Sequence, residues 1–124
     1  MGFAVVRIYE DTADAGYRVL VDRLWPRGVR KDDAHLDEWN TDVAPSAALR
    51  KWYGHDVARF DEFARRYRAE LARPPGADAV DALRRRGRRQ RVVLLTATKD
   101  VEHSGAQVLV DVLRRNDPFG TETR

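Results

Sequence analysis

Short apolar runs alternate with amphipathic stretches along the chain. The runs 4–9, 18–22 and 90–96 are rich in β-branched and aliphatic residues, which is typical of β-strands. Residues 92–95 are uniformly apolar, so 90–96 is predicted to be a central strand buried on both faces. Residues 11–16 carry Asp, Thr and Gly and suit a loop better than a crossover helix, which leaves open an antiparallel or an irregular connection between the first two strands.

Apolar side chains at helical spacing predict the helices. The clearest helix spans residues 57–71, where the apolar side chains fall on one stripe of a 3.6-residue repeat. Asp56 is its expected N-cap, and the sequence Pro-Pro-Gly at 74–76 ends it. Ser46 is a second N-cap, before a helix that contains residues 49–52. Three further stretches complete the pattern: 31–38 as a short helix or loop, 78–86 as a short helix, and a last helix carrying the apolar positions of 106–113.

Strands separated by helical stretches predict an α/β fold. We expect a single small domain over residues 1–124, with a short, mainly parallel sheet covered by helices. No apolar run approaches the roughly 20 residues that span a bilayer, and residues 1–7 do not resemble a secretory signal. The absence of cysteine excludes disulfides, thiolate metal sites and cysteine nucleophiles. We therefore expect a cytoplasmic protein with no membrane association; the sequence does not indicate its oligomeric state.

Arginines are concentrated in one block, residues 84–91, although the formal net charge of the chain is only +3. Such a block forms either a solvated helix end, stabilised by the helix dipole, or a surface that attracts polyanions. It contains no aromatic residue that would stack on a base, and no groove-entering motif accompanies it. A nucleic-acid-associated basic module is therefore the alternative to a small-molecule site, and not the favoured interpretation.

Charged and aromatic residues follow each predicted strand. These segments are 9–11, 22–27 and 98–100, with His103 one helical turn further on. Ligands collect beyond the carboxyl ends of the strands in parallel α/β sheets. If the strands run parallel, the three segments converge, and we predict that residues 22–27 face residues 99–103 across a shared hollow.

The side chains in these segments favour an anionic ligand. Asp22 and Asp100 are the candidate acid and base, because two nearby carboxylates in a cleft can have their pKa values pushed apart. Both have structural alternatives, as partner of a neighbouring arginine and as a helix cap respectively. Arg23 and Arg27 offer planar donor forks for phosphate or carboxylate, and Lys99 adds a point charge. Surface ion pairs are the alternative fate of these cations.

A mononuclear metal site is a further alternative. His103 follows Asp100 by three residues, so the two can share a helix face and ligate one ion, with His55 as a third candidate. An exposed or capping histidine is the plainer reading. Neither Gly-rich phosphate loop motif is present and neither serine lies in a nucleophile elbow, so the cofactor, if any, is unknown.

A set of motifs distributed over almost the whole chain carries a resemblance to a known family. These positions are Gly16 to Val29, Trp39, Ala44-Pro45-Ser46, Leu49-Arg50-Lys51-Trp52, His55-Asp56, Phe63, Arg66-Tyr67, Glu70-Leu71, Lys99-Asp100, Ala106 and Val108-Leu109. With them the chain closely resembles the YeaO-like family, a domain-of-unknown-function family. The resemblance implies a small bacterial cytoplasmic α/β protein without a secure biochemical activity.

Several family-like positions are added to the candidate site on the strength of this resemblance. Related sequences often carry Asn, and sometimes a further His, just after the Lys-Asp turn, where this chain has Glu102 to Gly105, and this departure weakens the metal hypothesis. We expect the protein to bind a small anionic molecule, phosphorylated or carboxylate, at the strand ends, with Asp-based acid–base chemistry as an optional extension. The candidate residues are Asp22 and Asp100 for catalysis, and Arg18, Arg23, Trp25, Arg27, Lys51, His55, Lys99 and His103 for ligand binding.

Overall fold

Four parallel strands form the sheet of the computed structural model, which describes residues 2–10 and 15–115. The order across the sheet is β1-β4-β2-β3, so β4 lies between β1 and β2. The α/β fold with a parallel sheet is thus confirmed. The strands are β1 (Gly2–Arg7), β2 (Tyr17–Leu20), β3 (Glu38–Trp39) and β4 (Arg91–Thr96).

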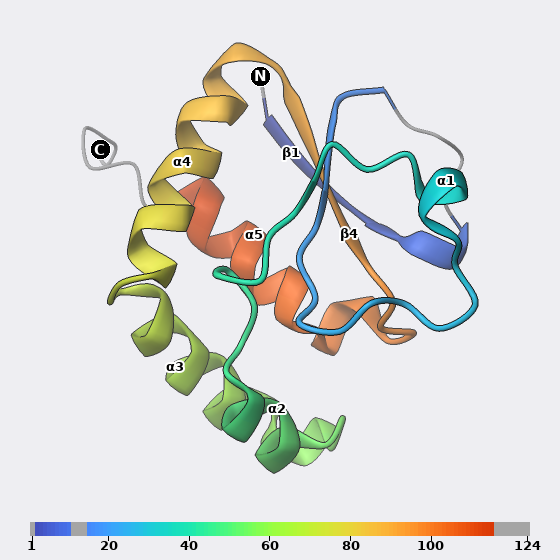
Figure 1. The fold of residues 1–124 in the computed structure, drawn as a ribbon. Helices are drawn as coiled ribbons and strands as arrows, with labels where there is room; N and C mark the ends of the chain where they lie inside the picture. The colour runs from blue at the N-terminus through green and yellow to red at the C-terminus, as the bar shows by residue number, and fades with distance from the viewer. Residues whose placement is uncertain (1, 11–14, 116–124) are drawn as a thin grey trace.

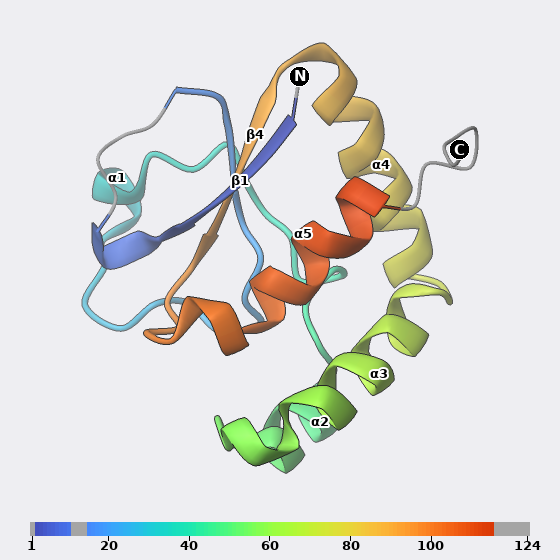
Figure 2. The ribbon, with the colours of Figure 1, turned by 180° about the vertical axis from the view of Figure 1, so that it is seen from behind.

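Helices cover both faces of this sheet. Figures 1 and 2 show α3, α4 and α5 on one side and α1 on the other. The helix expected over 57–71 is confirmed, except that its first turn is a 3-10 helix. The helices are α1 (Lys31–Ala34), α2 (Ala47–Tyr53), α3 (Phe60–Leu71), α4 (Gly76–Arg89) and α5 (Gly105–Arg115), with 3-10 turns at Ile8–Glu10, Val57–Arg59 and Val101–His103.

The side chains of β4 alternate between two apolar clusters. Val92 and Leu94 pack among the residues of the helices α2 to α5. Val93 and Leu95 face the opposite side, where Ile8 and Ala34 lie. All four β4 side chains are fully buried, as the uniformly apolar run predicts for a central strand.

Of the two expectations for the first two strands, the antiparallel pairing is wrong. β1 and β2 do not pair with each other, because β4 is inserted between them and pairs in parallel with each. A sheet with this order needs no tight antiparallel turn between β1 and β2. Residues 11–14, part of the predicted loop, lie outside the described residues.

The parallel arrangement brings the carboxyl ends of the strands to one edge of the sheet. The segment 21–27 leaves β2 there, and the segment 97–100 leaves β4 beside it. The backbone N–H of Val21 donates to the carbonyl of Leu95 (3.1 Å), which extends the pairing to the point where both strands end. Among the described residues, no helix has the length and apolar character needed to cross a bilayer.

Candidate functional site

A hollow of about 490 Å³ lies at the carboxyl edge of the sheet. Its walls come from the segment 21–27, the segment 97–100, the end of α2 and the start of α5. Of the three segments predicted to converge, 22–27 and 98–100 both line this hollow, and Tyr9 joins them from 9–11. Residue 11 lies outside the described residues. We call this cavity the strand-end hollow.

Asp22 is held firmly at the base of the β2 turn. One carboxylate oxygen accepts a hydrogen bond from Thr96 Oγ1 and the other accepts one from the backbone N–H of Ala97, both at 2.7 Å. Burial raises the pKa of the Asp22 carboxyl, although these two donors oppose the rise. Asp22 thus ties the end of β2 to the end of β4.

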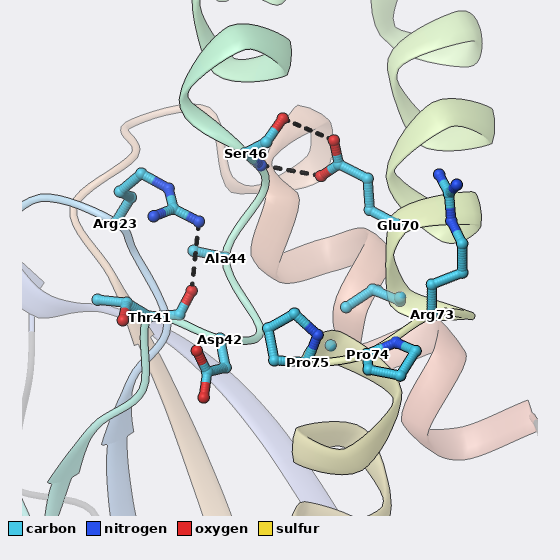
Figure 3. Close-up of a pocket in the computed structure, with 11 residues that line it drawn as sticks. Arg23, Thr41, Asp42, Ala44, Ser46, Glu70, Arg73, Pro74 and Pro75 are labelled. Carbon is cyan, nitrogen blue, oxygen red and sulfur yellow. Dashed lines mark hydrogen bonds between the residues drawn. The ribbon is translucent and has the colours of Figure 1, made fainter.

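Arg23 joins the same turn to the segment before α2. Its Nε donates to the carbonyl of Pro45 (2.9 Å) and its Nη2 donates to that of Thr41 (3.5 Å). The side chain borders both the strand-end hollow and a second pocket of about 430 Å³, shown in Figure 3. In that second pocket Glu70 accepts hydrogen bonds from the N–H (2.8 Å) and hydroxyl (2.6 Å) of Ser46. Two nitrogens of the Arg23 guanidinium thus donate to backbone carbonyls, so this side chain also stabilises the fold.

Three exposed cations surround the mouth of the strand-end hollow: Arg27, Arg50 and Lys99. Within the described part of the chain, their side chains make no hydrogen bond or ion pair. His55 is also exposed at the mouth, in a left-handed backbone conformation (φ 59°) after the Gly54 cap of α2. These charges face solvent and remain available to a ligand.

Aromatic side chains form much of the inner wall. Tyr53 stacks on Phe63 with ring centroids 4.2 Å apart, and its hydroxyl donates to the carbonyl of His103 (2.5 Å). Trp25 donates from Nε1 to the carbonyl of Val29 (2.7 Å) and contacts Trp39 edge-on. Their hydrogen-bonding groups are thus already engaged.

Three predicted ligand-binding residues do not line this hollow. Arg18 is buried within β2 and donates to the carbonyls of Ala34 (3.1 Å) and His35 (2.9 Å), where it secures the end of α1. Lys51 is exposed on another side of α2. His103 also lies outside the hollow. Its Nδ1 is 2.8 Å from Oδ2 of Asp100, which does line the hollow.

Arg50 and Tyr53 also line the hollow, although neither is among the predicted site residues. They are three residues apart on α2, a spacing that places both on one face of a helix. The buried Tyr53 fixes which face points inward, and Lys51 lies about 100° away from Arg50 around the axis. The signal in the sequence that indicates Arg50 is its position three residues before Tyr53, an aromatic residue on the inward face of the helix.

Two further groups of residues relate to the alternative functions, metal binding and nucleic-acid binding. Among the described residues, no group of three or more His, Cys, Asp or Glu side chains is placed to hold a metal ion. In the arginine block, Arg84 donates to the carbonyl of Val112 (2.9 Å) and Arg86 lies 4.0 Å over the ring of Tyr17. Both are thereby used within the fold, while Arg85, Arg88 and Arg89 are exposed.

Comparison with known proteins agrees with the resemblance seen in the sequence. A family model described as the inactive DUF488-N3 subclade matches residues 3–118. Uncharacterized proteins of Mycobacterium tuberculosis and Mycobacterium bovis are each 50% identical over 110 residues, which cover 88% of this chain and 91% of theirs. The uncharacterized protein YeaO of Escherichia coli is 38% identical over 117 residues, which cover 92% of this chain and 98% of YeaO. No solved structure matches. The chain therefore belongs to the YeaO-like DUF488 family.

Proposed function

We propose that the protein binds a small organic or phosphorylated anion in the strand-end hollow. The observation that carries this proposal is the set of exposed cations, Arg27, Arg50 and Lys99, around one concave site. Guanidinium forks suit carboxylate and phosphate, and four cationic side chains line the hollow against two carboxylates, Asp22 and Asp100. This excess of positive charge favours an anion at the opening. We also propose a cytoplasmic location, which is compatible with the absence of cysteine.

The proposal is for binding rather than turnover. Both carboxylate oxygens of Asp22 accept hydrogen bonds from the fold itself, and Asp100 is paired with His103. The matched family is described as an inactive subclade, which also supports binding alone. We therefore do not propose acid–base catalysis by Asp22 and Asp100. We also do not propose nucleic-acid or metal binding.

Titration with a small panel of anions tests this proposal. The probes are sodium phosphate, sodium acetate and sodium phenylacetate at constant ionic strength, with neutral 2-phenylethanol as the uncharged control. We expect at least one anion to shift the amide resonances of residues 22–27 and 97–100 in NMR spectra, and 2-phenylethanol to bind more weakly than phenylacetate. If the neutral control binds as tightly, or no anion binds, the proposed function is wrong.

Adjacent residues on α2 supply a matched pair of variants. Arg50→Ala removes a cation at the mouth, whereas Lys51→Ala removes one outside the hollow and changes the net charge equally. Arg50→Ala should weaken binding of the tightest anion by about tenfold, corresponding to roughly 1.4 kcal/mol. Lys51→Ala should leave the affinity nearly unchanged. Equal losses in both variants would show that only the overall charge matters.

A further inference from the structure

The strand-end hollow is divided between an apolar floor and a charged mouth. Val21, Tyr53, Phe63 and Ala106 line it and are each at most 5% exposed, so they form its inner surface. The cations described above are all exposed. A bound molecule therefore meets charge at the opening and apolar surface further in.

Polar groups near the floor have their hydrogen bonds satisfied by the protein. The Asp22 carboxylate has a donor on each oxygen. The hydroxyl of Tyr53 donates to a carbonyl, and that of Ser104 donates to Val101 (2.6 Å) and accepts from Gln107 (3.2 Å). A charged group placed at the floor would lose its hydration without gaining a free partner, and an anion there would also meet the Asp22 carboxylate. Apolar atoms suffer neither penalty.

The size of the hollow also exceeds what a bare anion needs. A volume of about 490 Å³ corresponds to roughly 16 waters at ~30 Å³ each. Inorganic phosphate or acetate fills a small part of that space and leaves the inner wall wet. A ring-sized organic body would cover the wall and release that water.

We propose that the ligand of this site is an aromatic carboxylate, with its carboxylate at the mouth beside Arg50 and Lys99 and its ring on the apolar floor. This inference rests on the proposed function and narrows it to one chemical class. The carboxylate retains solvent and cationic partners, while the ring rests against the buried floor and removes water from the exposed side chain of Leu24. A ring that carries a second charge would not fit this class, because that charge would lose its hydration at the apolar floor.

The affinities within the anion panel test this class. Phenylacetate and acetate carry the same head group, so the ratio of their dissociation constants reports the ring alone. We expect phenylacetate to bind at least about tenfold more tightly than acetate, because its ring is removed from water. Equal affinities for phenylacetate, acetate and phosphate, with shifts at the hollow, would overturn the aromatic class and leave anion binding intact. If no anion binds, the proposed function fails as well.

Two exposed apolar residues provide variants that locate the ring. Leu24 lines the hollow and is 56% exposed, whereas Val57 is 51% exposed and lies outside it. Because both are exposed, truncation should leave the fold intact. Leu24→Ala should weaken phenylacetate binding by roughly fivefold without affecting acetate, and Val57→Ala should change neither. Equal effects of the two variants on phenylacetate would contradict a ring bound within the hollow.

Discussion

Asp22 shows how a single residue can serve the fold at the edge of a binding site. Its carboxylate receives two donors from the segment that follows β4, and its own carbonyl accepts from Trp39 Nε1 (2.8 Å) on the neighbouring β3. Three strands are thus connected through one residue just beyond the end of β2. Asp22 acts mainly by positioning the turn that carries Arg27.

The raised pKa of Asp22 predicts a pH-dependent contribution to stability. A carboxyl whose folded pKa lies above its ordinary value of 3.8 stabilises the fold when protonated, and this contribution is lost as pH rises through the folded pKa. Asp22→Asn does not titrate, so the variant should gain stability relative to wild type as pH rises from about 3 to about 7. Urea unfolding of both proteins across this range measures the change, at about 1.4 kcal/mol per unit of pKa shift.

A widening advantage of wild type over Asp22→Asn with rising pH would mean that the two hydrogen-bond donors outweigh burial. The direction of the pKa shift would then be the reverse of that inferred here.

The sequence predicts which residue types belong at the site better than it predicts which individual residues reach it. Arg23, Arg27, Lys99 and Asp100 were selected because they immediately follow strands, and the structure brings them to one hollow. Lys51 was selected by its position in a family-like motif, and the helical phase of α2 turns it away. Arg18 was chosen the same way, although its place within a buried strand commits its guanidinium to backbone carbonyls.

At the scale of elements, long periodic segments were predictable and very short ones were not. The strand β3 has only two residues, Glu38 and Trp39, too few to show an alternating pattern. It forms because β2 offers a free edge, through the register Val19 with Glu38 and Leu20 with Trp39. This pairing depends on a neighbouring strand, which local sequence does not reveal.

The contact between α4 and β1 depends on the absence of a side chain at Gly87. A Cβ at this position would lie 2.4 Å from the tip of the Phe3 ring, so an alanine fits only if this ring, which packs against the core, moves. Gly87→Ala should therefore destabilise the protein by about 1–3 kcal/mol despite the better helix propensity of alanine. Chemical denaturation measures the loss.

A double-mutant cycle separates the steric conflict from other effects of the substitution. In a Phe3→Ala background the obstructing ring is gone, and Gly87→Ala should then stabilise α4 by up to about 1 kcal/mol. The effect of Gly87→Ala on the free energy of unfolding thus changes sign between the wild-type and the Phe3→Ala backgrounds. If Gly87→Ala is harmless in both, the Phe3 ring can move aside without cost.

At the scale of the whole molecule, the sequence predicted that separate segments would converge but not how the strands are ordered. Convergence follows from the common direction of the strands, because all their carboxyl ends then meet at one edge. The insertion of β4 between β1 and β2 was not foreseen, since strand periodicity reports burial and not the identity of the partner. The buried run of β4 indicated only that it would be central.

The exposed arginines near the end of α4 lie next to the amino end of β4, whereas the hollow lies at its carboxyl end. This separation predicts that the two regions act independently. Replacing Arg88 and Arg89 by glutamate should therefore leave anion binding in the hollow unchanged at physiological salt, where the Debye length is about 8 Å. Titration of the double variant with phenylacetate measures this, and a marked loss of affinity would show that the hollow depends on the general field of the protein.

The number of arginines in the block that are not used within the fold limits any binding to nucleic acid. Arg84, Arg86 and Arg91 each have a partner within the protein, which leaves Arg85, Arg88 and Arg89 of the block to contact phosphates. Each neutralised phosphate contributes about −0.9 to the slope of log affinity against log salt, so these three arginines support a slope of about −2.7. Fluorescence anisotropy with a random DNA duplex should show weak association that disappears near physiological salt. A much steeper slope, abolished by the Arg88 and Arg89 substitutions, would instead identify this end of α4 as the core of a nucleic-acid surface.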